Sequence, residues 1–270
     1  MERPDWAPQG IDLSRPSVSR IYDFYLGGSH NFEVDREAGR KAIVAFPGLP
    51  KIMQANRAFM RRAVRHAASR GVTQFLDIGS GIPTFGNVHE VAQEANPDSR
   101  VVYVDNDPVA VAHSRAVLKG NTNAAVLSAD FRAPQDILNS PEVRAQLDLD
   151  KPVALLLVAL LHFIQNSEEP AKTIETFHQA LPSGSFLVLT HASTDGGPRT
   201  SEEGDRIQDV YRNASSQLVM RSRSEVEALF GGFTIEEPGI VAMPNWRPDG
   251  PVDNDDPVIF TGFAGVGRKA

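Results

Sequence analysis

The sequence contains no cysteine, so it can form neither a disulfide nor a metal site built on thiolates. It also lacks a long apolar run, because the longest, residues 152–161, is too short to span a bilayer. No signal peptide is recognisable. Basic residues are outnumbered by acidic ones, 27 to 34, and the net charge of −7 argues against a nucleic-acid partner. We therefore expect a cytoplasmic protein without a membrane segment.

The seven histidines are too scattered to give metal-ligand spacing, so no metal site is predicted. The rest of the composition is ordinary for a globular protein, with 41% hydrophobic and 23% charged residues. A chain of 270 residues can bury one good core, and its length is as consistent with one elaborated domain as with two. The sequence gives no indication of an oligomeric state.

Residues 75–92 (FLDIGSGIPTFGNVHEVA) predict a strand, a tight glycine turn and a helix. Gly79 and Gly81 let the main chain approach a ligand without a Cβ in the way, and the following helix N-terminus offers free N–H groups. A second apolar run ends in Asp105, about 24 residues after Gly81, which suits one β-α-β unit. Asp105 can accept hydrogen bonds from both hydroxyls of a ribose and would repel a 2′-phosphate.

The remainder of the chain alternates between strand-like apolar runs and helical periodicity. Helices are expected at 18–26, 36–46 and 52–70, and further strands at 100–104, 124–128, 152–161 and 185–191. A later helix is expected to start at a capping box of Ser224 and Glu227. The last apolar runs, 233–241 and 258–266, are joined by a loop too short for a helical crossover, which predicts an antiparallel pair.

The order Asp77, Gly79, Gly81, Asp105 resembles that of class I S-adenosylmethionine-dependent methyltransferases, whose first motif is an acid followed by G-x-G. Thr84 stands where a dinucleotide fold needs a small residue, so the glycines do not form G-x-G-x-x-G. The phrases SRIYDFYLGGSHNFEVDRE, ANRAFMRRAV, VVYVDNDPV and PVALLLVALLHFI extend the resemblance to an actinobacterial family of S-adenosyl methyltransferases, formerly a domain of unknown function. This resemblance spans nearly the whole chain.

The resemblance implies an α/β fold with a doubly wound, mostly parallel seven-stranded sheet whose last strand inserts antiparallel. Residues 1–71 would form an N-terminal arm and helical cap, and residues 72–270 a Rossmann-like methyltransferase domain, together making one compact unit. It also implies S-adenosylmethionine as cofactor, S-adenosylhomocysteine as product, and no metal.

Ligands of doubly wound sheets bind beyond the carboxyl ends of the strands. Around that edge we expect cofactor contacts from Asp77, Gly79, Ser80, Gly81, Asp105, Asn106, Asp130, Phe131, Ala159 and Leu160. From the cap, Tyr22, Asn31 and Arg57 are expected to contribute, Arg57 through a bidentate contact to the cofactor's carboxylate. The alternative roles are a turn for Asn106, a helix cap for Asp130, core packing for Phe131 and a solvated charge for Arg57.

His162 and His191 follow the fourth and fifth expected strands and are the candidate catalytic residues. An unperturbed histidine titrates near working pH and can act as a general base. The alternative for both is packing or hydrogen bonding.

The predicted function is S-adenosylmethionine-dependent methyl transfer to a small-molecule acceptor. A cofactor-binding protein without turnover, used as a sensor or partner, stays open because no obvious acid–base pair is present. A nicotinamide-dependent reductase is disfavoured by the missing third glycine and by the absence of a Tyr-x-x-x-Lys pair. The sequence does not identify the acceptor or its reacting atom.

Overall fold

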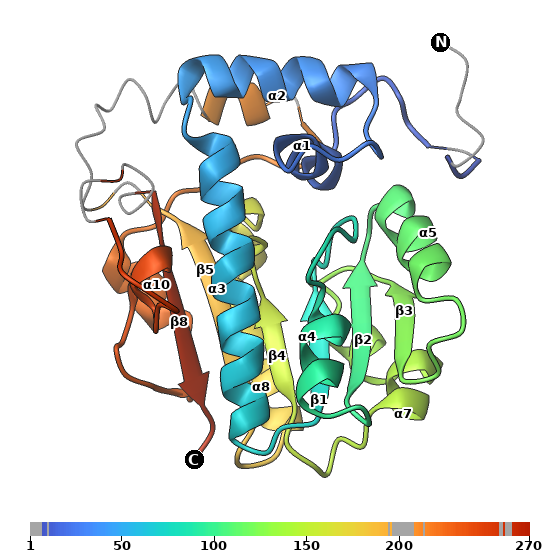
Figure 1. Cartoon of the computed structure of the whole chain (residues 1–270), viewed down its shortest axis with the longest axis vertical. Coiled ribbons are helices and arrows are strands. Elements are labelled where there is room, and N and C mark those ends of the chain that lie inside the picture. Colours follow the sequence, from blue (N-terminus) through green and yellow to red (C-terminus); the bar gives the residue numbers. More distant parts are fainter. Residues whose placement is uncertain are drawn as a thin grey trace.

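The structure is a computed structural model that describes residues 7–9, 11–193, 195, 208–212, 214–253, 256 and 261–270. Within them, a central sheet lies between two layers of helices (Figure 1). Its parallel strands are β1 (Gln74–Ile78), β2 (Arg100–Asp105), β3 (Ala124–Ser128), β4 (Ala154–Leu157) and β5 (Phe186–Ala192).

The strand order is β3-β2-β1-β4-β5-β8-β6, so the chain winds outward from β1 on one side and resumes at β4 on the other. Strand β8 (Gly262–Arg268) inserts antiparallel beside β5, and its other edge pairs with the short strands β6 (Thr234–Ile235) and β7 (Val241–Ala242). Eight strands therefore occupy seven positions across the described sheet. The predicted doubly wound, mostly parallel sheet is confirmed.

Helices cover both faces of the sheet because its central strands are apolar on both sides. One face packs against α3 (Leu49–Ser69) and α4 (Val88–Ala95). The opposite face packs against α6 (Pro134–Leu138), α7 (Pro141–Gln146), α8 (Pro170–Ala180) and α10 (Arg223–Ala228). Beside β2 and β3, α5 (Pro108–Val117) begins at the cap Asp107, whose carboxylate accepts the Val109 N–H at 2.8 Å.

Helices α1 (Val18–Tyr25) and α2 (Glu33–Ala45) lie above the carboxyl ends of the parallel strands, and α3 descends from them across the sheet (Figure 1). The side chains of Phe59, Ala63 and Val64 on α3 are buried in the same cluster as one face of the sheet. The helical cap therefore shares a core with the sheet.

Two polar contacts anchor the cap. Ser17, just before α1, donates its hydroxyl to Asp107 at the start of α5. The buried Arg62 of α3 donates from Nε to the Trp246 carbonyl at 2.9 Å and from Nη2 to the Met243 carbonyl at 2.7 Å. Through these backbone carbonyls, the guanidinium of Arg62 binds η3 (Met243–Asn245) and the residue after it to α3. The cap is held at both ends by residues far apart in the sequence.

Several expected elements differ in detail. Helices α2 and α3 begin at Glu33 and Leu49, each three residues before its expected start. Helix α10 is capped by Ser222 and Glu225, not by Ser224 and Glu227, since two overlapping S-x-x-E patterns compete and the helix begins at Arg223. Strand β4 ends at Leu157, and η1 (Leu161–Phe163) follows it. The expected strand 233–241 is split into β6 and β7 by a turn in which Gly239 N–H donates to Glu236 O.

The start of the expected strand 258–266 lies outside the described residues. No helix in the described ranges is both long enough and apolar enough to cross a membrane.

Candidate functional site

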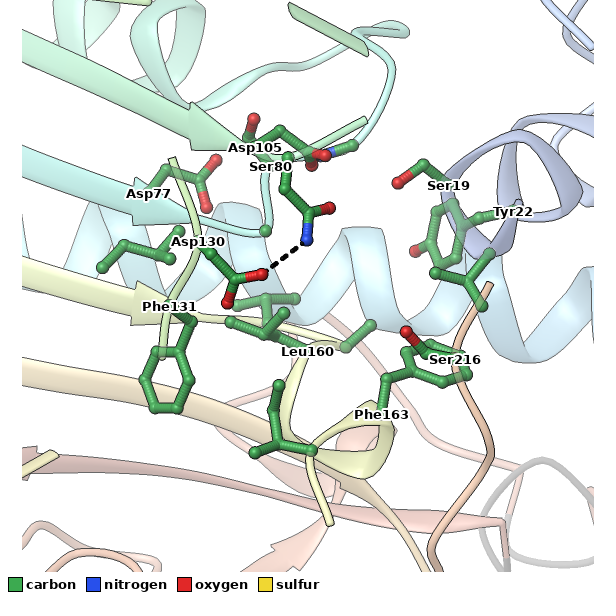
Figure 2. A pocket seen from close by; sticks show the side chains of 18 of the residues that line it. Ser19, Tyr22, Asp77, Ser80, Asp105, Asp130, Phe131, Leu160, Phe163 and Ser216 are labelled. Atoms are coloured by element: carbon green, nitrogen blue, oxygen red, sulfur yellow. Dashed lines mark hydrogen bonds between the residues drawn. The ribbon is translucent and has the colours of Figure 1, made fainter. Parts of the chain in front are cut away.

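A hollow lies at the carboxyl ends of β1, β2 and β4, where the strand order switches direction. It contains about 920 Å³ of empty space, its open mouth included, and is lined by both polar and apolar side chains. Figure 2 shows Asp77, Asp105 and Asp130 on one side of it, and Ser19 and Tyr22 of α1 on the opposite side. We call this hollow the first cavity.

The glycine turn, residues 79–81, lines the first cavity with bare backbone. Gly79 and Gly81 have φ angles of 73° and 65°, in the left-handed region that favours glycine. A Cβ on Gly79 would lie 2.7 Å from Cδ1 of Leu160. The Gly79 N–H donates to the Val104 carbonyl at 2.8 Å, so the turn cannot shift without leaving β2. Only glycine fits at position 79.

We expect Gly79→Ala to lower both the stability and the ligand affinity of the protein. The left-handed backbone alone costs an L-residue about 1–2 kcal/mol, and the contact with Leu160 adds to it. The matched control is Gly71→Ala at the end of α3, where φ is 88° but the added Cβ meets open space. Both variants should melt earlier, whereas only Gly79→Ala should lose S-adenosylhomocysteine affinity by calorimetry. Equal affinities would contradict the prediction.

Asp105 closes the glycine turn from the neighbouring strand. Its Oδ2 accepts the Gly81 N–H at 2.7 Å and its Oδ1 accepts the Asp107 N–H at 2.8 Å. Burial raises its pKa to about 6, although these backbone donors oppose the shift. A carboxylate has about four lone-pair positions, so acceptor capacity remains even with the Asn106 N–H also acting on this group. The hydroxyls of a ribose are donors that could use it.

Asp77 is a buried acid at the edge of the same hollow, and its carboxylate has no hydrogen-bond partner in the described part of the chain. Burial raises its pKa to about 7, and the nearby positive charge of Arg57 acts in the opposite direction. A buried carboxyl without a partner is costly to ionise unless a cation binds beside it. Asp77 is therefore suited to a positively charged ligand group.

Arg57 of α3 braces the loop that follows the glycine turn. Its Nη2 donates to the carbonyls of Phe85 and Gly86 at 3.4 and 3.3 Å and to Oδ1 of Asn87 at 3.1 Å. Its Nε is buried without a hydrogen-bond partner, and the side chain lines the first cavity. An unsatisfied buried donor of a guanidinium is what a carboxylate ligand would pair with.

Asn106, Asp130 and Phe131 also line the first cavity. Asn106 Nδ2 donates to Asp130 Oδ2 at 2.9 Å, the bond drawn in Figure 2. Burial alone would raise the pKa of Asp130, but the Arg132 N–H, the Asn106 amide and the Arg132 charge lower it overall. The acid is thus an ionised acceptor. Phe131 is buried, stacks on Phe177 at a centroid distance of 6.3 Å and also lines the cavity.

A second hollow, of about 750 Å³ with its opening, lies between the cap and the ends of β4 and β5. We call it the second cavity. It shares five lining residues with the first cavity: Val18, Tyr22, Asn56, Ala159 and Phe163. The two hollows therefore meet at a common wall.

A directed chain of hydrogen bonds runs through this wall. The Ala159 N–H donates to Thr190 Oγ1 at 2.8 Å, and the Thr190 hydroxyl donates to Asn56 Oδ1 at 2.7 Å. Asn56 Nδ2 donates to the Tyr22 hydroxyl at 2.9 Å, which in turn donates to the Met53 carbonyl at 3.3 Å. Ala159 has a φ of 56°, so the chain holds a strained backbone in place.

We expect Thr190→Val to lower the free energy of unfolding by about 1–3 kcal/mol, because valine leaves a buried N–H and a buried amide oxygen unpaired. Chemical denaturation measures this. Thr122→Val is the control, since Thr122 lies exposed in the turn before β3. An unchanged midpoint for Thr190→Val would show that the chain of bonds adds nothing to stability.

His162 and His191 line the second cavity and not the first. His191 Nδ1 donates to its neighbour's carbonyl, that of Ala192, at 2.6 Å, and its Nε2 accepts from Arg221 Nη1 at 2.7 Å. Burial lowers the pKa of His191 to about 4 and that of His162 well below its usual range. Both rings are neutral at working pH. Their catalytic role stays a prediction, and the satisfied ring of His191 fits the packing alternative.

Asn31 lines neither cavity. Its Nδ2 donates to Asp23 Oδ2 at 2.7 Å and to the Gly28 carbonyl at 2.9 Å. A Cβ on Gly28 would lie 2.0 Å from the Asp23 carboxylate, so the Gly27-Gly28 turn wraps this acid closely. Asn31 therefore fixes the loop between α1 and α2. The other predicted cofactor-binding residues all line the first cavity.

The sequence analysis did not single out Asn56, Thr190, Tyr25, Tyr211 or Arg221. Of these, only Asn56 could have been noticed in the sequence, because it is a polar residue on the otherwise apolar face of α3. In the described part of the chain no three histidine or acidic side chains gather where they could hold a metal ion, and the absence of a metal stays a prediction.

Comparison with known proteins identifies the family to which this chain is similar. Residues 4–270 match the S-adenosyl methyltransferase family. A “putative methyltransferase” from Thermobifida fusca YX is 42% identical, with 98% of this chain and 99% of that one covered and a TM-score of 0.91. A DUF574 family protein from Streptomyces avermitilis MA-4680 is 38% identical over 96% of this chain and 99% of that one, with a TM-score of 0.90. No curated protein matches.

Proposed function

The chain belongs to the S-adenosyl methyltransferase family, and we propose that it transfers a methyl group from S-adenosylmethionine to a small-molecule acceptor. One observation carries this proposal. A glycine turn at the switch point of the sheet is bonded to the buried carboxylate of Asp105, and both line the first cavity.

The donor set of the first cavity fits each part of the cofactor. Asp105 has acceptor capacity for the ribose hydroxyls, and Asn106 lines the same hollow and can offer its amide to the adenine edge. Asp130 orients that amide, since its carboxylate accepts from Asn106 and pairs with Arg132. The unpartnered carboxylate of Asp77 suits the ammonium group. The free Nε of Arg57 suits the carboxylate at the same end.

When bound, the cofactor supplies a methyl group on a sulfonium: the acceptor's lone pair forms the new bond to carbon while the carbon–sulfur pair stays on sulfur. The protein contributes by aligning the acceptor with the methyl group, and such positioning can lower an activation barrier by about 7–11 kcal/mol. Tyr22, Asn56 and Ala159 stand at the shared wall, where their linked hydrogen bonds fix its shape. These bonds link Tyr22, Asn56 and Ala159 to one another and to Met53, so we assign this wall a positioning role.

Two alternatives remain as outcomes of the test. A binding protein without turnover would hold the cofactor and transfer nothing. A nicotinamide-dependent reductase would bind NADH. Neither is favoured by the family to which the chain belongs.

Isothermal titration calorimetry with S-adenosylmethionine, S-adenosylhomocysteine and NADH separates these functions. We expect both S-adenosyl compounds to bind and NADH not to bind. Methyl transfer is then followed with a labelled methyl group across a panel of hydroxyl, amine and thiol acceptors. No binding of either S-adenosyl compound would refute the proposal, whereas binding without transfer to any acceptor would favour the sensor.

A further inference from the structure

We propose that the second cavity receives the methyl acceptor, and that this acceptor is an uncharged, largely apolar molecule carrying at least one hydrogen-bond acceptor atom. The inference rests on the proposed function, because it assumes that the first cavity holds S-adenosylmethionine. It goes beyond it by assigning a place and a chemical class to the molecule that is methylated.

The first argument is the contrast in charge between the two hollows. The first cavity is lined by the charged side chains of Arg57, Asp77, Asp105, Asp130 and Arg132. Among the described residues, the second cavity has no aspartate, glutamate, lysine or arginine in its lining. A charged molecule would lose its hydration there without gaining an ion pair, which costs several kcal/mol or more.

The second argument is that the titratable side chains of the second cavity are neutral at working pH. Burial lowers the pKa values of His162 and His191, as described above, so neither carries a charge. Burial raises the pKa of Tyr25 far above its usual range and that of Tyr211 to about 12. Tyr22 is shifted upward for the same reason. The described lining therefore has no ionised group that could form an ion pair with a charged ligand.

Arg221 is a positive charge bonded to His191 of this lining, and its donors already have partners. It donates to the carbonyls of Leu161 and Ile164 at 2.8 and 2.9 Å, to Asn166 Oδ1 at 2.6 Å and to the ring of His191. It does not line the cavity. Its role is to hold the segment that follows β4 against β5, behind the histidines.

The third argument is a hydrogen-bond donor in the lining of the second cavity that is available to a ligand. The hydroxyls of Tyr25 and Tyr211 are 3.0 Å apart and share one hydrogen bond. Two hydroxyls carry two protons, and this bond uses only one of them. Within the described residues the second proton has no acceptor, so it can be donated to a ligand. The rest of the lining is dominated by apolar side chains such as Phe46, Leu49 and Leu218.

The fourth argument is position. The shared wall carries Tyr22, Asn56 and Ala159, and Phe163 contacts both hollows. A molecule in the second cavity would therefore meet the cofactor at this wall. The wall is held by the hydrogen bonds through Thr190, so the approach of the two ligands is preset by the fold.

Binding to the full-length protein saturated with S-adenosylhomocysteine tests the proposal. The probes are matched pairs of one ring system: 1-naphthol against 1-naphthoate, and 4-phenylphenol against 4-phenylbenzoate. We expect at least one neutral member to bind about tenfold or more tighter than its carboxylate by calorimetry. Leu218→Trp, which fills the second cavity, and Leu218→Glu, which puts a charge in it, should each weaken this binding by about tenfold or more.

Val44→Trp is the control, because Val44 is 84% exposed on the outer side of α2. It should leave both ligands unchanged, and the Leu218 variants should keep their S-adenosylhomocysteine affinity, which also reports that they are folded. Suppose that S-adenosylhomocysteine binds the parent protein. The acceptor assignment is then overturned, and the proposed function is not, by any of three results: no neutral probe binds, the carboxylates bind equally well, or Leu218→Trp has no effect. If S-adenosylhomocysteine does not bind the parent protein, the proposed function falls, and the acceptor assignment with it.

Discussion

Replacing Asp105 with alanine is expected to weaken S-adenosylmethionine binding by about a hundredfold or more. Each hydrogen bond from a ribose hydroxyl to a carboxylate contributes about 1.5–3 kcal/mol, and 1.4 kcal/mol corresponds to tenfold in affinity. Alanine also removes the acceptor of the Gly81 and Asp107 N–H groups, at 2.7 and 2.8 Å. The glycine turn would lose its tie to the end of β2, so the remaining contacts would be less well placed.

Calorimetry with S-adenosylhomocysteine measures the loss, and thermal melting without ligand reports whether the variant folds. Asp105→Asn is the companion variant, since it keeps the shape and one acceptor oxygen and should lose less affinity than alanine. Asp98→Ala, an exposed acid in the loop before β2, serves as the control. If Asp105→Ala bound the ligand as tightly as the parent protein, the ribose assignment would be refuted.

Asp77→Asn is expected to stabilise the ligand-free protein above neutral pH while weakening its binding of S-adenosylmethionine. Burial raises the folded-state pKa of Asp77 from 3.8 to about 7. The unfolded chain releases this proton near pH 4, so it binds fewer protons than the folded chain between pH 4 and 7. Stability therefore falls as pH rises through this window, by up to about 4 kcal/mol for three pKa units. Asparagine does not titrate and removes this loss.

The same ionisation has the opposite effect on binding. A cationic ligand favours the ionised carboxylate, so affinity in the parent protein should rise with pH up to about 7 and then level off. The asparagine variant should bind about tenfold more weakly at pH 8 and show a smaller pH dependence. Urea denaturation and calorimetry across pH 5.5–8.5 give both curves. A variant with the parent's pH profile in both measurements would place the titration elsewhere.

The central β-α-β unit could be predicted closely from the sequence because its signals are local. The β3 boundaries match the expected ones, and the acids at 77, 105 and 130 all line the first cavity, as expected. A glycine turn, the helix that follows it and an acid at a strand end each depend on the conformation of the backbone close by in the sequence. This part of the site needed no knowledge of distant contacts.

The second cavity could not be predicted in this way. Thr190 and Asn56 are 134 residues apart and meet only because α3 crosses the end of β5. Asn31 lies outside both cavities because its side chain donates to Asp23, and its contact with the cofactor stays a prediction. Arg62 looks like an exposed helix charge in the sequence, yet it is buried against the carbonyls of η3. Each outcome depends on tertiary packing that no local pattern encodes.

The anchor of Arg62 has a consequence for synthesis. Its carbonyl partner at Trp246 lies 184 residues later in the chain, so a ribosome adding about 5–20 residues per second delivers it roughly 10–40 s after the helix itself. Throughout that interval the guanidinium of Arg62 stays hydrated, because the carbonyls that it binds have not yet been made. The contact between α3 and η3 can therefore form only near the end of synthesis.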